Sequence, residues 1–454
     1  MTNYVAAVER LYALGHELHH GPSRKFDLAH MRLLCGELGN PQLKTPAVLV
    51  AGTNGKGSTS ATLASILKAS GHRTGLYTSP HLLRINERIQ LDGKPIADES
   101  FAAAYDRVTT AAQVLVERGE LPHLPSFFET LTTMAFDYFA REQVEIAVLE
   151  VGMGGRLDAT NIVEPIASII TDIDLDHQNY LGNTIAAIAG EKAGILRSNA
   201  VAITLPQHPE ANQVLGERMM ELGSHAVSAT RNLPPLVPGA DAAGAVSEGL
   251  TRYPLQVLGR QVEIASPLVG RHQLRNLALA ITAAEELAAL GYRITPESTA
   301  RGVRQTEWPG RFQRMAATTE RPEVVLDVAH NPAGAWALRA TLSEQYEGRP
   351  MVLLFAAMAD KAVAQMAQIL WPTMQRVVLT HVSGNPRAAQ VADLAVLAEE
   401  LGVRHTEAAT VPEAIHLACR QARELGEEAL LVVAGSIYLA GEALPALRMA
   451  DTKS

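Results

Sequence analysis

The residues with the clearest chemical potential form a glycine-rich loop, Gly52-Thr-Asn-Gly-Lys-Gly-Ser58, between an apolar run and a segment with helical spacing. Glycine permits tight turns in which successive N–H groups point at one anion. A helix N-terminus favours phosphate for the same reason, and Lys56 adds a positive charge. A plain strand-to-helix turn is the alternative. The order of strand, glycines, lysine, hydroxyl and helix instead favours a nucleotide polyphosphate site, although the Lys-Gly-Ser ending departs from the common G-x-x-x-x-G-K-[ST] pattern.

Two further apolar runs end in groups that could bind a metal ion. Glu150 follows a buried run, and a carboxylate there is costly unless it meets a cation such as magnesium. An ion pair with Arg156 is the alternative partner. Asp172, Asp174, Asp176 and His177 cluster after another run, where a metal site and a purely structural histidine remain equally open.

The segment Thr78-Ser-Pro-His81 follows the second predicted strand of the chain. Ligands of open α/β sheets bind outside the carboxyl ends of the strands. A hydroxyl and the following arginines could therefore serve magnesium and an anionic substrate. A strand-end turn at Pro80, followed by a solvated loop, explains the pattern equally well.

Lys192 lies inside an apolar helical segment. Its simplest interpretation is a lysine whose stem packs on apolar surface or whose ammonium forms an ion pair. If it is desolvated near a metal, it could instead be neutral and take up CO2 as an anionic carbamate. Sequence alone leaves both interpretations open.

A later strand ends in Asp327-Val-Ala-His330, directly before a predicted helix. Asn331-Pro332 reads as an N-cap followed by proline at the first helical position. Capping explains Asn331 but not Asp327 and His330 together. Ser436 follows another strand and is a weak signal by itself.

Strand-like and helix-like segments alternate, which predicts α/β architecture with mostly parallel sheets flanked by helices. The predicted strands are 47–51, 74–78, 146–151, 167–171, 201–205, 324–328, 351–356, 376–380 and 430–434. The predicted helices are 60–69, 100–117, 127–141, 184–196, 274–290, 333–345, 362–370, 388–401 and 411–425.

The chain of 454 residues is too long for one ordinary core, so two domains are expected. We expect an ATP-binding domain over 1–304 with a small antiparallel appendage near 232–270. A hinge over 305–311 contains a Pro-Gly pair. A smaller domain over 312–454 completes the chain.

The amino-acid composition of the chain argues against several classes of protein. The net charge of −9 argues against a nucleic-acid-binding surface. Two cysteines are too few for a disulfide framework or a thiolate metal site. The sequence contains neither a secretory signal nor an apolar run near 18 residues, so a cytoplasmic protein is expected.

Taken together, the motifs resemble the folylpolyglutamate synthase/dihydrofolate synthase family of the Mur-ligase superfamily. The resemblance covers nearly the whole chain and includes no departure at a catalytic motif. The motifs that carry it, in order, are Gly52–Ser58, Thr78–Leu82 with Asn86–Arg88, Glu150–Asn161, Asp176-His177, Glu191–Gly194, Trp308–Arg311, Leu326–Pro332 and Gly435-Ser436.

The resemblance implies an N-terminal P-loop ATPase-like domain and a Rossmann-like C-terminal domain. It implies an ATP-dependent ligase in which a folate or dihydropteroate carboxylate becomes an acyl phosphate that L-glutamate then attacks. The implied ions are Mg²⁺, two in number, with a monovalent cation as a further candidate. The implied protein is a monomer with no nucleic-acid or membrane partner, and its two domains close during turnover.

The resemblance also assigns roles to individual residues. It implies Ser79, Glu150, His177 and a carbamylated Lys192 as metal ligands. Its ATP contacts are Gly52, Thr53, Asn54, Gly55, Lys56, Gly57, Ser58, Asn276, Arg311 and Asp327. The residues it places on the substrate side are Phe127, Leu157, Asp158, Ala159 and Ser436. The four with catalytic roles are Lys56, Lys192, Asp327 and His330.

Two other functions are compatible with parts of this pattern. A Mur-type ligase of peptidoglycan precursors shares the ligase motifs. A P-loop ATPase without ligase activity needs only the loop and metal site, and it has no use for the Asp327/His330 motif. A choice between a monofunctional synthase and a bifunctional one cannot be made from these residues.

Overall fold

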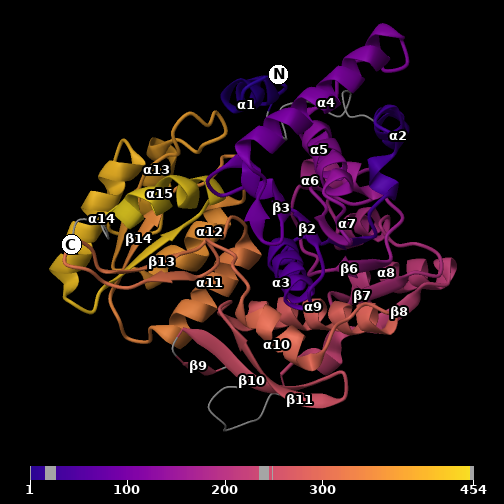
Figure 1. Cartoon of the computed structure of the whole chain (residues 1–454). Helices are drawn as coiled ribbons and strands as arrows, with labels where there is room; N and C mark the ends of the chain where they lie inside the picture. The colour runs from indigo at the N-terminus through magenta and orange to yellow at the C-terminus, as the bar shows by residue number, and fades with distance from the viewer. Residues whose placement is uncertain (1, 16–26, 235–244, 248, 450–454) are drawn as a thin grey trace. The chain divides into compact units, whose positions relative to one another are not determined.

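The computed structural model describes residues 2–15, 27–234, 245–247 and 249–449. The chain forms two compact units, each coloured along the sequence in Figure 1. The first unit comprises Met1–Ala243, Arg252–Ser266 and Gln273–Glu307, and the second comprises Gly244–Thr251, Pro267–His272 and Trp308–Ser454.

The sheet of the first unit has the strand order β4-β3-β2-β5-β1-β6-β7-β8. Central β1 pairs in parallel with β5 and β6, and all residues of β1 and β5 are buried, as expected for a sheet covered on both faces. At one edge β3 and β4 run antiparallel. The strands are β1 (Ala47–Ala51), β2 (Thr74–Tyr77), β3 (Ile89–Leu91), β4 (Lys94–Pro95), β5 (Ile146–Glu150), β6 (Ala167–Ile170), β7 (Val201–Thr204) and β8 (His225–Ser228).

Helices cover both faces of this sheet. The connection from β1 to β2 through α3 and that from β6 to β7 through α7 run in opposite directions, so right-handed crossovers place these helices on opposite faces. The chain therefore switches direction beside β1, where open α/β sheets bind ligands. The helices are α1 (Tyr4–Ala13), α2 (Leu28–Glu37), α3 (Lys56–Ala69), α4 (Asp98–Glu117), α5 (Phe127–Arg141), α6 (Gln178–Leu181), α7 (Ile185–Ala193), α8 (Pro209–Leu222), α9 (Arg271–Ala289) and α10 (Pro296–Arg304).

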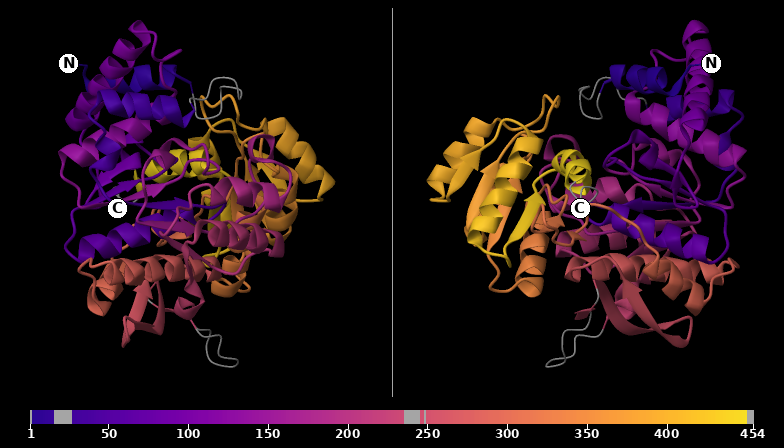
Figure 2. Two further views of the ribbon diagram at one scale, coloured as in Figure 1. Left: turned by 90° about the vertical axis from the view of Figure 1, so that its right-hand side faces the viewer. Right: turned by 60° about the vertical axis from the view of Figure 1, so that its left-hand side comes forward.

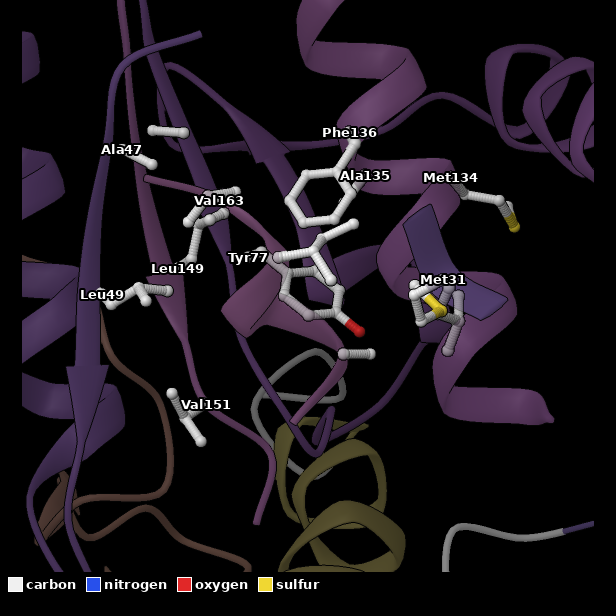
Figure 3. Packing of buried hydrophobic residues seen from close by; sticks show 14 of the residues in the cluster. Met31, Ala47, Leu49, Tyr77, Met134, Ala135, Phe136, Leu149, Val151 and Val163 are labelled. Carbon is white, nitrogen blue, oxygen red and sulfur yellow. The ribbon is translucent and has the colours of Figure 1, made fainter. Parts of the chain in front are cut away.

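The main core of the first unit lies between the sheet and α5. Figure 3 shows Phe136 of α5 close to Tyr77 of β2, to Leu149 of β5 and to Val163, which precedes β6. The ring of Phe139 lies 3.0 Å from where a Cβ on Gly75 would stand. Glycine in β2 thus allows the helix to approach the sheet.

A small separate sheet has the order β11-β10-β9. Its strands are β9 (Ala245–Ser247), β10 (Leu250–Val257) and β11 (Arg260–Ser266). Leu258 and Gly259 join β10 to β11 with φ of 49° and 78°, the backbone of a type I′ hairpin. The predicted appendage thus contains an antiparallel hairpin, while 235–244 and 248 within it lie outside the described residues.

The second unit has its own sheet of order β12-β13-β17-β14-β15-β16, in which β12 is antiparallel and the other pairs are parallel. Figure 2 shows helices packed along these strands. The strands are β12 (Gln313–Met315), β13 (Glu323–Leu326), β14 (Met351–Phe355), β15 (Arg376–Leu379), β16 (His405–Glu407) and β17 (Leu430–Ala434). The helices are α11 (Pro332–Gln345), α12 (Val363–Leu370), α13 (Val391–Glu400), α14 (Val411–Leu425) and α15 (Ile437–Met449).

The predicted α/β class with mostly parallel sheets is confirmed, and the ranges of β1, β17, α5 and α14 coincide with their predictions. The predicted helix over 184–196 was too long, because α7 ends at Ala193. There a Cβ on Gly194 would lie 2.4 Å from Cβ of Arg156. Edge strand β16 was missed, because its partly exposed sequence has no apolar run.

Candidate active site

The glycine-rich loop connects central β1 to the N-terminus of α3. Gly55 caps this helix with φ of 90°, and a Cβ there would lie 2.1 Å from Oδ1 of Asn276. A Cβ on Gly52 would lie 1.7 Å from Oγ1 of Thr171. Both glycines are therefore required by close neighbours, and Asn276, a predicted ATP contact, lies against the loop.

The loop is also tied to the chain that leaves β6. The carbonyl of Asp172 accepts the N–H groups of Thr53 and Asn54 at 2.8 and 3.1 Å. The Thr53 hydroxyl lies 3.0 Å from both the carbonyl and the N–H of Asp174. These bonds hold the first half of the loop, while α3 holds Lys56, Gly57 and Ser58 in its first turn.

Two lysines share one carbonyl of the loop. Nζ of Lys56 donates to Gly52 at 3.1 Å and to Thr53 at 3.2 Å, and Nζ of Lys192 donates to Gly52 at 2.8 Å. Lys192 is 3% exposed. Burial first, and then the charge of Lys56, lower the pKa of Lys192 to about 7. A neutral amine is the form of lysine that reacts with CO2.

Glu150 ends β5 with its side chain buried, and its Oε2 accepts the N–H of Ser79 at 3.3 Å. The two residues come from neighbouring strands, and His177 follows β6 on the other side of β1. Arg156, the alternative partner of Glu150, instead pairs with Glu191 at 2.8 Å. A buried carboxylate beside a serine fits the oxygen preference of magnesium. The described residues contain no group of three or more His, Cys, Asp or Glu side chains placed to hold a metal, so an ion would depend on this mixed set.

His177 has φ of 52° at the N-terminus of α6, and its Nε2 lies 3.9 Å from Oδ2 of Asp176. This left-handed backbone is uncommon for a residue with a side chain. Its ring is about one-third exposed, which leaves it accessible to an ion.

The predicted substrate-side residues of the first unit fall into two groups. Leu157 is exposed, whereas Phe127 and Ala159 are buried. The Phe127 ring stacks on Tyr12 with a centroid distance of 5.5 Å, and the guanidinium of Arg88 lies 5.2 Å from the Phe127 ring centroid.

Asp158 organises its own loop. Its Oδ2 accepts the N–H groups of Gly152 and Met153 at 3.1 Å, and its Oδ1 accepts from the backbone and hydroxyl of Thr160 at 3.0 and 2.6 Å. Four bonds to one carboxylate give Asp158 a structural role that the sequence motif did not reveal.

In the second unit, Asp327 is buried just after β13. Its two oxygens accept the N–H groups of Phe312 and Ala329, both at 2.8 Å. Burial raises the pKa of Asp327, and Arg311 opposes that rise. Asn331 caps α11 through the N–H of Gly334, so the predicted cap is confirmed.

The ends of β13 and β17 are linked in this unit. The N–H of Gly435 donates to the carbonyl of Ala329 at 3.1 Å, which ties the Ser436 turn to the segment carrying Asp327 and His330. Ser436 accepts the N–H of Tyr438 at 3.1 Å, and Nδ1 of His330 lies 3.0 Å from the carbonyl of Val328. The sequence motifs of the second unit therefore meet at the carboxyl edge of its sheet.

Comparison with known proteins decides the family. Residues 50–284 match the Mur ligase middle domain, and 310–437 match the Mur ligase, glutamate ligase domain. A folylpolyglutamate synthase of Lacticaseibacillus casei is 37% identical over 82% of this chain and 85% of its own length. A dihydrofolate synthase/folylpolyglutamate synthase of Bacillus subtilis is 36% identical over 81% and 83%. The Mycobacterium tuberculosis folylpolyglutamate synthase, solved with ADP and AMPPCP, has a TM-score of 0.85 and 34% identity over 99% of both chains.

The chain belongs to the folylpolyglutamate synthase/dihydrofolate synthase family. Membership confirms the predicted class of enzyme, an ATP-dependent amide ligase with the two-domain Mur ligase fold. The peptidoglycan and ligase-free alternatives are not favoured. In the part of the chain that the structure describes, no helix is both long and apolar enough to cross a membrane.

Sequence reasoning missed Arg275, and it did not predict that Asp172 pairs with Arg275 beside the glycine-rich loop. Arg275 of α9 forms a two-pronged ion pair with Asp172, with a shortest distance of 2.6 Å. The available signal was weak, because Arg275 merely precedes Asn276 and Asp172 was one of several acids after β6.

Proposed function

We propose that this enzyme joins the amino group of L-glutamate to the carboxylate of a reduced folate or dihydropteroate at the expense of ATP. The observation that carries the proposal is the loop after β1, where Gly52 accepts from both Lys56 and Lys192. Lys56 places a positive charge in the first turn of α3, at a helix N-terminus where ATP phosphates are stabilised. The ADP and AMPPCP in the Mycobacterium tuberculosis relative support ATP as the nucleotide.

The reaction would proceed in two displacements. A substrate carboxylate oxygen attacks the γ-phosphorus of ATP, the bond to the β-phosphate oxygen breaks, and ADP leaves. The glutamate nitrogen then attacks the acyl carbon, phosphate leaves, and the nitrogen loses a proton. Lys56 and the loop N–H groups would stabilise charge on the phosphates, which is mainly electrostatic catalysis by positioned groups.

We also propose that Ser79, Glu150, His177 and a carbamylated Lys192 hold two magnesium ions. Such ions would neutralise phosphate charge. The support is the buried Glu150 carboxylate, which lies beside Ser79 and offers the oxygen ligands that magnesium prefers. Asn276, Arg311 and Asp327 are proposed ATP contacts, and His330 and Ser436 are proposed to line the glutamate or acyl-phosphate region.

The phosphate-release test uses purified enzyme, ATP and glutamate with tetrahydrofolate, dihydropteroate or a muramyl peptide. We expect release with a folate or a pteroate, together with an amide product of the expected mass. Release only with the muramyl peptide would contradict the proposal. The folylpolyglutamate synthase and the dihydrofolate synthase/folylpolyglutamate synthase relatives are almost equally similar to this chain, at 37% and 36% identity, and similarity therefore does not choose between them. Activity with both tetrahydrofolate and dihydropteroate in this screen would indicate a bifunctional enzyme, and activity with one of them a monofunctional enzyme.

A cytoplasmic, monomeric enzyme without nucleic-acid partners is part of the same proposal. The net charge of −9 supports the last point. Light scattering during size-exclusion chromatography would test the monomer, and a mass near twice that of the chain would contradict it.

A further inference from the structure

We propose that Arg275 is a positioning residue for ATP, because it fixes Asp172 and thereby the first half of the phosphate loop. The inference rests on the proposed nucleotide site. It concerns a residue outside the motifs that identify the family, and it depends on contacts within the first unit.

The guanidinium of Arg275 is held at several points. Its Nε lies 3.0 and 2.9 Å from the two oxygens of Asp172, and its Nη2 lies 2.6 Å from Oδ1. Nη2 also donates to the carbonyl of Pro206 at 3.0 Å. Paired bonds of this kind fix the orientation of a carboxylate as well as its distance.

The backbone of Asp172 supports the loop directly. The carbonyl of Asp172 accepts the N–H groups of Thr53 and Asn54. Asn54 and Asp172 also form an isolated antiparallel β-bridge. Side chain and main chain of Asp172 thus connect Arg275 to the two residues that precede Gly55. A shift of Asp172 would move the loop N–H groups relative to the phosphates.

The same helix touches the loop at a second point. Asn276 lies against Gly55, and its Nδ2 donates to Gln273 at 2.9 Å. Helix α9 therefore sets the loop directly through Asn276 and indirectly through Arg275. These two contacts hold Thr53, Asn54 and Gly55, which belong to the proposed phosphate site.

The solvent exposure of the Arg275–Asp172 ion pair distinguishes a role in positioning the loop from a role in global stability. The side chains of Arg275 and Asp172 are 31% and 36% exposed. Ion pairs so accessible to water contribute little to global stability. Loss of the pair should therefore appear in nucleotide binding rather than in the melting temperature.

The test compares Arg275→Gln, Arg275→Lys, Asp172→Asn and the double variant Arg275→Gln/Asp172→Asn in the full chain. We expect kcat/KM for ATP to fall roughly 10- to 100-fold in Arg275→Gln, the scale of a small misplacement at a reacting site. KM for glutamate should stay within about twofold of wild type, since the proposed glutamate region is at His330 and Ser436. Arg275→Lys should recover only part of the loss, because lysine lacks the paired donors.

The double variant should be no worse than Arg275→Gln, because both changes break one connection. The matched control is Arg231→Gln, which breaks an ion pair of 3.1 Å to Glu285 on the same helix. It should leave kcat/KM for ATP unchanged. Wild-type kcat/KM for ATP in Arg275→Gln, or full additivity in the double variant, would overturn the inference.

Isothermal titration calorimetry with ADP tests the role of Arg275 without relying on the proposed ligase reaction. ADP should bind Arg275→Gln more weakly than wild type, with melting temperatures within about 2 °C in the absence of ligand. Equal ADP affinity would overturn the positioning role even if the ligase reaction is confirmed. If no folate or pteroate supports phosphate release from ATP, that result would instead contradict the proposed function alone.

Discussion

Lys56 provides the simplest test at the scale of single residues. We expect Lys56→Ala to lower kcat/KM for ATP by roughly 100- to 1,000-fold, because it removes a charge-stabilising donor from the phosphate site. The melting temperature should change little, since the side chain is only half-buried and its ammonium donates to two carbonyls of the loop itself. Lys68→Ala, an exposed lysine on the same helix, is the matched control. Normal ATP use by Lys56→Ala would exclude the lysine from the phosphate site.

Lys192 gives a prediction about pH. Only a neutral amine reacts with CO2, and a pKa of about 7 makes half of the Lys192 side chains neutral near pH 7. Carbamate should therefore increase between about pH 6 and pH 8, whereas ordinary lysines, with a pKa near 10.4, remain protonated there.

The carbamate can be followed by ¹³C NMR of metal-free enzyme in labelled bicarbonate. The signal should be missing in Lys192→Arg, which keeps a positive charge and cannot be neutralised. A pH-independent signal, or one that survives in Lys192→Arg, would rule out Lys192 as the carbamylated residue.

At the scale of elements, the turn from β1 into α3 depends on glycine contacts, of which that of Gly55 with Asn276 can be tested directly. Gly55→Ala should abolish detectable ADP binding, because φ is 90° and the new Cβ would overlap Asn276. Gly71→Ala is a close control, since Gly71 has φ of 88° and nothing lies within 4 Å of its Cβ position. Each change costs about 1–2 kcal/mol of backbone strain. ADP titration of both variants isolates the clash with Asn276, and equal ADP binding by the two variants would contradict it.

The positions of residues on strands and helices explain which parts of the site could be predicted from the sequence. Glu150 and Asp327 were found because buried strands are recognisable runs and their carboxyl ends lie at one edge of a parallel sheet. The Arg275–Asp172 pair was not found because its members lie 103 residues apart. Periodicity describes each element alone and does not say which side chains of α9 face β6.

At the scale of the whole molecule, the two units have separate hydrophobic cores. Leu49 and Phe139 belong to one core, and Trp371 packs edge-on against Phe355 at 5.4 Å in the other. We expect two calorimetric transitions, because separate cores can unfold separately. Trp371→Ala should destabilise one transition by about 3–5 kcal/mol, and Leu49→Ala should destabilise the other. A single transition shifted equally by both variants would contradict independent cores.

The sequence by itself determined the α/β class, the glycine-rich loop between strand and helix, the polar residues at strand ends and the family. These depend on local runs and on the order of motifs, which survive without knowledge of distant contacts. Tertiary structure alone decided that Lys192 is buried against Gly52, that Asp158 organises its own loop, that Phe127 contacts Tyr12 and Arg88, and that Arg275 holds Asp172. The physical reason is that burial, pKa and side-chain partners depend on segments far apart in the chain, which meet only when the sheet and its helices have assembled.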